Sequence, residues 1–147
     1  MTLTASEVEE YMSIEKKFLK GNSLELKSHF RLSEKLVCDK YGDIFIIDFR
    51  QGTIEISLVT SNLRTTDCTI LSRLDLGDKE HKNPDGVKVR GPHVHVYREG
   101  YGDKFAYPVS DFFEVEDSMN FPSIIDKYLE YCNIKPIKLI FQWELFK

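Results

Sequence analysis

The N-terminal segment places apolar residues at the spacing of an amphipathic helix. Thr4 is suited to cap such a helix, and Glu7, three residues later, completes a capping-box pattern. Because residues three and four apart share one face of a helix, the pattern predicts a helix over residues 5–20 that ends at Gly21 and Asn22. The apolar positions of this face are Val8, Tyr11, Met12, Ile14, Phe18 and Leu19.

From residue 23 onward the apolar positions alternate with polar ones, which is typical of strands with one buried face. In residues 23–33 the alternating positions are Leu24, Leu26, Ser28, Phe30 and Leu32. Turn residues at Gln51–Gly52 and at Gly100–Asp103 are typical of hairpins. Further strands are predicted at residues 43–50, 52–60, 66–76, 93–99 and 104–110.

The helical spacing returns near the C-terminus. Residues 118–133 carry Pro122 near the first turn and an apolar face further on, which predicts a second helix. Residues 136–147 fit either a strand or a short helix. The pattern as a whole predicts an α+β fold in a single domain of residues 1–147, with an N-terminal helix, an antiparallel sheet of about six strands, a C-terminal helix and a final apolar element.

Composition narrows the class of protein. No segment approaches the roughly 20 apolar residues that span a bilayer, and the N-terminus lacks the basic and apolar regions of a secretion signal. Cys38, Cys68 and Cys132 lie far apart without a C-x-x-C pair, which is typical of reduced thiols and disfavours a zinc site built on cysteine. We therefore expect a cytoplasmic protein that has no membrane partner; the sequence does not give its oligomeric state.

Charge is distributed unevenly along the chain. The net charge of −4 argues against a general nucleic-acid binder. Residues 81–108, however, carry five Lys or Arg and three acids, whereas residues 109–131 carry six acids and one lysine. The first of these segments is therefore a basic island in an acidic protein, and a local anion site there fits its charge.

The basic island holds the most distinctive motif, "GPHVHVYREGYGDKFAY", with "HKNPDG" ten residues upstream. Because side chains alternate along a strand, His93 and His95 point to the same face, toward solvent or a cleft, while Val94 and Val96 point to the core. The "NPDG" turn is expected to hold His81 and Asp85 near the strand that follows. Residues 77–92 otherwise form a long irregular stretch, and such stretches are often functional.

Three chemistries are compatible with these histidines. A divalent transition metal could be bound by His81, His93 and His95 with Asp75 or Asp85 as the carboxylate. Without any cofactor, His93 and His95 could be the general acid and base on a phosphodiester. In the third chemistry the segment only binds an anionic partner. For the two catalytic or binding options, the predicted substrate-binding residues are Arg90, Tyr97, Arg98, Lys104 and Tyr107.

Each observation also has a purely structural interpretation. The two histidines could be polar side chains on a solvent-exposed sheet face, and His81 could be a residue of a surface loop. Arg73 and Asp75 share a sheet face, where we expect an ion pair rather than catalysis. Arg50 and Arg64 are weaker candidates in or beside strands, and His29 is expected to be structural.

The stretch "SRLDLGDKEHKNPDG" followed by "GPHVHVYREGYGDKFAYP" resembles a family of small bacterial proteins of unknown function, mostly from Gram-positive species. The resemblance covers residues 48–133, and Phe105 stands where tryptophan is expected in relatives. It implies no established activity. A more distant, shorter family has a similar P-H-x-H hairpin after an H-x-x-P turn and resembles the toxins of toxin–antitoxin pairs. That likeness implies a role connected with mobile or defence-related DNA.

The leading hypothesis is a toxin-like ribonuclease or another enzyme acting on a phosphate-bearing substrate such as RNA. His93 and His95 would be its acid–base pair, assisted by His81. The rival is a non-enzymatic inhibitor from a phage or mobile element that blocks a host defence complex, a protein partner. Its acidic residues 109–131 would enter a basic channel, with Phe112, Phe113 and Phe121 as anchors. A metal-binding protein built on the same histidines is the third hypothesis.

Overall fold

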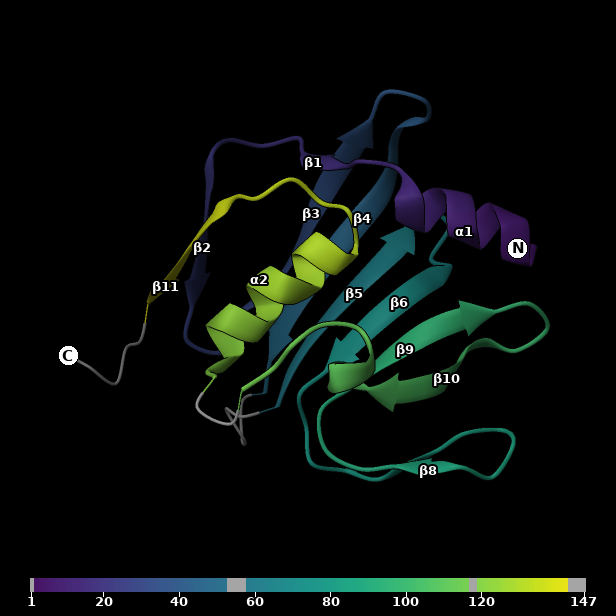
Figure 1. The fold of residues 1–147 in the computed structure, drawn as a ribbon. Coiled ribbons are helices and arrows are strands. Elements are labelled where there is room, and N and C mark those ends of the chain that lie inside the picture. The colour runs from purple at the N-terminus through teal and green to yellow at the C-terminus, as the bar shows by residue number, and fades with distance from the viewer. Residues whose placement is uncertain (1, 53–57, 117–118, 143–147) are drawn as a thin grey trace.

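The computed structural model describes residues 2–52, 58–116 and 119–142. Within these residues an antiparallel sheet of seven strands forms the centre of the molecule, in the order β1-β3-β4-β5-β6-β9-β10 (Figure 1). The elements are α1 (Ala5–Ser13), β1 (Lys17–Phe18), β2 (Ser23–Lys27), β3 (Arg31–Cys38), β4 (Gly42–Gln51), β5 (Val59–Thr65), β6 (Ile70–Asp75), β7 (His81–Lys82), β8 (Lys88–Val89), β9 (His93–Arg98), β10 (Gly102–Pro108), the 3-10 turn η1 (Val109–Asp111), α2 (Phe121–Tyr131) and β11 (Lys138–Gln142).

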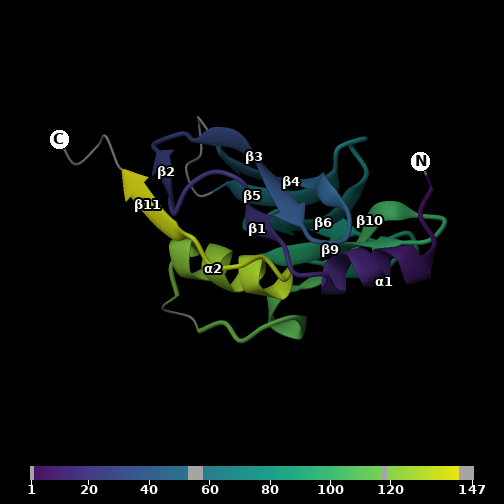
Figure 2. The same cartoon turned by 90° about the horizontal axis from the view of Figure 1, so that it is seen from above.

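Helices α1 and α2 lie on the same side of this sheet, as Figure 2 shows with the molecule seen from above. The core lies between the sheet and the helices, where Phe45, Ile47 and Leu63 from the strands meet Ile125 and Tyr128 of α2. This arrangement confirms the predicted α+β class. It also leaves the opposite face of the sheet to polar residues, and the candidate site lies on that face.

The N-terminal prediction needs two corrections. The helix ends at Ser13, not at residue 20, because Lys16 turns into the core, where its ammonium donates to the carbonyl groups of Ile14 and Cys132 at 2.8 and 2.9 Å. The predicted strand of residues 23–33 is two strands, β2 and β3, separated at His29, whose φ is 60°. The backbone N–H of His29 donates to the side chain of Gln51, so this histidine has a structural place in the turn.

In the middle of the chain, β4, β6, β9 and β10 occupy the predicted positions. The prediction missed most of β5, because Ser61 and Thr65 are polar residues on its buried face and hide the alternation. Most of the strand predicted at residues 52–60 lies outside the described residues.

At the C-terminus, α2 begins after the cap Asn120, whose side chain accepts from the Ser123 N–H. The final apolar element is a strand, since β11 pairs in parallel with β2. Residues 143–147 lie outside the described part.

Candidate functional site

Two rows of side chains cross the polar face of the sheet, because residues directly opposite on neighbouring strands share a face. From β3 to β9, the first row consists of Arg31, Arg50, Thr60, Asp75 and His93. The second row consists of Ser33, Asp48, Asn62, Arg73 and His95. The register therefore brings arginines from three strands onto the same face as both histidines of β9.

His93 and His95 share one face, as predicted, but they do not point to open solvent. Their exposed fractions are 3% and 2%. The ring of His81 lies against both, with ring centroids 5.8 Å from His93 and 4.7 Å from His95. All three histidines of the motif are therefore gathered in one cluster.

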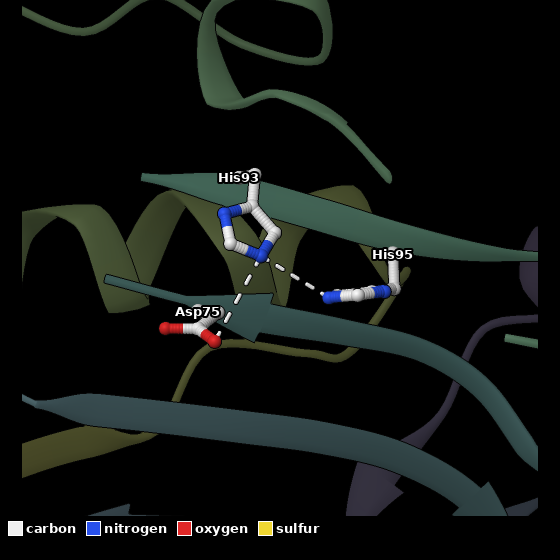
Figure 3. Close-up of side chains that lie close together, drawn as sticks. All are labelled: Asp75, His93 and His95. Atoms are coloured by element: carbon white, nitrogen blue, oxygen red, sulfur yellow. Dashed lines mark hydrogen bonds and ion pairs between the residues drawn. The ribbon is translucent and has the colours of Figure 1, made fainter. Parts of the chain in front are cut away.

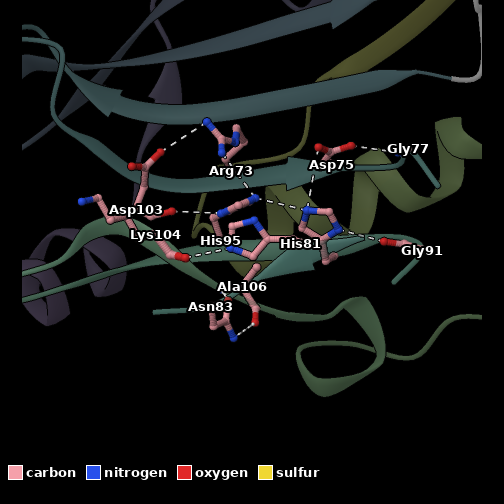
Figure 4. A network of polar contacts seen from close by, with 11 residues as sticks. Arg73, Asp75, Gly77, His81, Asn83, Gly91, His95, Asp103, Lys104 and Ala106 are labelled. Carbon is pink, nitrogen blue, oxygen red and sulfur yellow. Dashed lines mark hydrogen bonds and ion pairs between the residues drawn. The ribbon is translucent and has the colours of Figure 1, made fainter. Parts of the chain in front are cut away.

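The segment that carries His81 is fastened to the free edge of the sheet, as Figures 1 and 4 show. A ring nitrogen of His81 donates to the carbonyl of Lys104 at 2.8 Å. The buried amide of Asn83 makes two bonds to Ala106, donating to its carbonyl at 2.9 Å and accepting from its N–H at 2.8 Å. Asn83 thus takes the place of a neighbouring strand, a role that the sequence analysis missed although the residue lies in the "HKNPDG" motif.

The backbone fixes the tautomer of both buried histidines. Nδ1 of His93 lies 2.8 Å from the carbonyl oxygen of Gly91, and Nδ1 of His95 lies 2.9 Å from that of Asp103. A carbonyl oxygen only accepts, so each Nδ1 must carry the hydrogen. In the neutral rings each Nε2 therefore presents a lone pair, and hydrogen bonds of this kind orient the histidines of metal sites.

The two Nε2 atoms face each other at 3.1 Å, as Figure 3 shows. Two lone pairs at this distance repel unless a cation, either a proton or a metal ion, lies between them. Burial, and after it the charge of Arg73, lowers the pKa of His95 to about 4, which disfavours a proton on this ring at neutral pH. Two nitrogens each about 2.1 Å from one ion would lie about 3.0 to 3.4 Å apart for octahedral to tetrahedral angles, which includes the observed separation.

Asp75 supplies a carboxylate at the same place. Its Oδ2 lies 3.8 Å from Nε2 of His93, and the ligand atoms of Asp75, His93 and His95 all lie within 4.8 Å of one another. Oδ1 accepts from the N–H of Gly77 at 2.8 Å, which holds the carboxylate in this orientation. A Cβ atom at Gly77 would lie 3.0 Å from Oδ1 and 2.8 Å from Cδ2 of Leu58, so a larger residue there would have to displace one or both of these side chains.

Arg73 does not form the expected ion pair with Asp75. Its guanidinium lies 3.3 Å from the carboxylate of Asp103 and 3.3 Å from Nε2 of His95 (Figure 4). The pairing of β9 with β10 shifts register between Gly102 and Phe105, and this irregularity presents both the carbonyl and the carboxylate of Asp103 to the cluster. Arg73 is thus the cation beside the histidines.

The side chains of the other predicted site residues are exposed or form their hydrogen bonds outside the cluster. Asp85 is exposed and accepts from the N–H of Val87, so it is Asp75 that accompanies the histidines. Arg98 lies over the ring of Phe105 and donates to Tyr107, on the opposite face of the sheet.

The side chains of three more predicted substrate-binding residues are bonded elsewhere or exposed. The hydroxyl of Tyr97 accepts from the N–H of Leu3, and the side chains of Arg90 and Lys104 are exposed. A substrate role for all five of these residues stays a prediction.

A groove of about 520 Å³ adjoins Asp75 and Arg73 on the polar face. Arg31, Arg50 and Arg64 also line it, and a second hollow of about 310 Å³ shares Arg50, Thr60 and Asp75 and adds Lys79. The cationic lining residues outnumber the carboxylates Asp48 and Asp75. Sequence reasoning did not single out Arg31, because only the register places it opposite Arg50.

The aromatic residues of the acidic segment are partly buried. Phe112, Phe113 and Phe121 pack against the core. Glu114 and Glu116 are exposed, and Asp117 lies outside the described residues. A protein partner for this segment stays a prediction.

Comparison with known proteins supports one part of the resemblance, a family of unknown function. A family model described as a family of unknown function, DUF6978, matches residues 3–134. The chain belongs to this family. No curated protein and no solved structure matches it. The DUF6978 match extends further toward the N-terminus than the predicted 48–133 and includes the histidine cluster and the arginine groove. In the part of this DUF6978 protein that the structure describes, neither helix is long and apolar enough to cross a membrane.

Proposed function

We propose that Asp75, His93 and His95 bind a divalent transition metal and that this centre hydrolyses a phosphate-bearing substrate. The observation that carries the proposal is the 3.1 Å separation of two Nε2 atoms whose Nδ1 partners are both committed to backbone carbonyls. A bound cation removes the repulsion between the two lone pairs, and the Asp75 carboxylate offsets its charge.

Two histidines and one carboxylate form the ligand set of many catalytic zinc and non-haem iron sites, which keep further coordination positions open. A metal held in this way supplies a Lewis acid and an activated water at neutral pH. The residues of the protein orient the ligands and provide a positive charge for the substrate. Gly77 orients Asp75, the carbonyls of Gly91 and Asp103 orient the imidazoles, and Arg73 offers its charge to an anionic substrate.

A metal-free ribonuclease using His93 and His95 as acid and base is the second candidate. The contact between Arg73 and Nε2 of His95, at 3.3 Å, favours it, because the guanidinium occupies the lone pair that a metal would need. In this case the Asp75 carboxylate, whose Oδ2 lies 3.8 Å from Nε2 of His93, stabilises the imidazolium that His93 forms during proton transfer. The two candidates use the same residues and differ in their response to a chelator.

Calorimetric titration of chelator-treated protein with Zn²⁺, Mn²⁺ and Co²⁺ tests metal binding. We expect one equivalent to bind to the wild type, with the visible spectrum of Co²⁺ reporting nitrogen ligands. Asp75→Asn and His95→Gln should weaken binding at least tenfold. His29→Asn is the matched control, because it removes a histidine outside the cluster and asparagine tolerates the left-handed backbone at that position. Equal affinity in all four proteins would overturn the site.

Cleavage assays on RNA and on small phosphate esters then separate the two candidates. Activity that is lost in EDTA and restored by metal supports the metal centre. Activity that persists in EDTA but is lost in His93→Ala/His95→Ala supports the acid–base pair, and growth of a bacterial host that expresses each protein reports toxicity. A folded wild type, with metal bound, that cleaves none of these substrates would overturn the hydrolytic role.

A further inference from the structure

We infer that the groove holds a substrate with two phosphate groups, one beside the Asp75–His93–His95 cluster and the other between Arg31 and Arg50. The first position rests on the proposed function. The second position rests only on the arginines, so it can be tested independently of the proposed function.

Arg31 and Arg50 are an unusual pair. They lie directly opposite each other on β3 and β4, both are exposed, and neither forms an ion pair within the described residues. Like charges directly opposite on neighbouring strands destabilise a sheet. An anion placed between the two guanidinium groups removes this repulsion, and arginine binds phosphate in a bidentate geometry.

The other arginines of the groove are already paired. Arg64 donates twice to Asp48, at 2.7 and 3.2 Å, and Arg73 contacts Asp103. Arg31 and Arg50 therefore have guanidinium groups free for a ligand in the described part of the chain, whereas Arg64 is committed to the fold.

The register sets the distance between the two positions. Arg50 and Asp75 belong to the same row and are two strands apart, so their Cα atoms lie about 10 Å from each other. Thr60 occupies the position between them in this row, and Asn62 occupies the corresponding position in the second row; both side chains are polar but uncharged. A ligand that complements these uncharged polar side chains has two phosphates joined by a neutral polar linker, such as a sugar.

The volume and the charge balance favour a short ligand. The groove of about 520 Å³ is in the range of small-molecule sites, and the net charge of −4 disfavours a long polyanion. Two sources share the required chemistry: consecutive phosphates of a short oligonucleotide, and a small sugar bisphosphate.

Calorimetry in EDTA with three probes tests the arginine position without any metal. The probes are inorganic phosphate, fructose 1,6-bisphosphate and a 5′-phosphorylated uridine dinucleotide. We expect at least one two-phosphate probe to bind the wild type at least tenfold more tightly than inorganic phosphate, and the preferred probe identifies the source. Arg31→Thr/Arg50→Thr should lose this advantage. Lys20→Thr/Lys27→Thr, which removes the same charge from exposed positions outside the groove, should keep it.

Folding and metal dependence complete the test. Threonine suits strands, so Arg31→Thr/Arg50→Thr should melt no lower than the wild type, and lost binding then reports the subsite. Adding metal should tighten the two-phosphate probe in the wild type but not in Asp75→Asn. If metal has no effect while the arginine dependence holds, the proposed function fails and the anion subsite stands. If the arginine variant binds every probe as the wild type does, the inference is overturned.

Discussion

Nε2 of His93 lies 3.1 Å from Nε2 of His95, while Nδ1 of each ring is bound to a backbone carbonyl. The strand alternation alone would place the two side chains on one face, but it would not turn the two imidazoles toward each other. Their orientation comes from the carbonyls of Gly91 and Asp103. The backbone thus prepares two nitrogen lone pairs to share one cation.

The position of the third ligand depends on Gly77. A Cβ atom there would approach Oδ1 of Asp75 and the side chain of Leu58, so Gly77→Ala should displace the carboxylate from the histidines. We expect metal affinity to fall about 10- to 100-fold, as for other residues that orient a metal ligand. Gly100→Ala is the control, because its φ of +87° strains alanine but a Cβ there meets no neighbour. Titration calorimetry should show a loss of metal affinity in Gly77→Ala. Gly100→Ala should keep its metal affinity and lose only stability, which urea unfolding measures.

The segment that carries His81 packs over His93 and His95, and its position depends on Asn83. Asn83→Ala removes two hydrogen bonds to Ala106 and leaves a buried N–H and carbonyl on the edge strand without partners. The free energy of unfolding should fall by about 2 kcal/mol. Asp85→Ala, in the same turn, removes one exposed contact and should cost well under half as much. Urea unfolding gives the stability, and amide exchange at Ala106 should quicken only in Asn83→Ala; equal stability losses in the two variants would contradict the role of Asn83.

The fold class, the shared face of His93 and His95, and the importance of the "HKNPDG" motif could all be predicted, because each depends on local spacing. The burial of the histidines could not, because it depends on where residues 77–92 fold back. The choice of Asp75 over Asp85 could not either, since it depends on the pairing of β6 with β9. The arginine groove could not be predicted either, because Arg31 and Arg50 meet only through the register of β3 with β4, and Arg64 comes from β5, which was largely missed.

Arg73 competes with a metal ion for His95. Because its guanidinium lies 3.3 Å from Nε2 of His95, Arg73→Met should free this lone pair and remove a repelling positive charge. We expect Zn²⁺ to bind about tenfold more tightly, while affinity for inorganic phosphate in the metal-loaded protein falls. Arg64→Met, which breaks the ion pair with Asp48 on the same face, is the control and should leave metal affinity nearly unchanged. Weaker metal binding in Arg73→Met would show that the arginine supports the cluster and does not compete with the ion.

The buried Lys16 should make stability depend on pH. Its side chain is fully buried, and burial lowers its pKa from 10.5 to about 8. Between these two pH values the unfolded chain holds the proton and the folded chain does not, so the contribution of Lys16 to the free energy of unfolding rises with pH. Relative to Lys16→Met, the wild type should gain about 2–3 kcal/mol between pH 7 and pH 10. Urea unfolding of both proteins at the two pH values measures this difference, in which the titration of other groups largely cancels. A difference that stays constant with pH would mean that Lys16 keeps its proton in the folded protein, held by the carbonyls of Ile14 and Cys132.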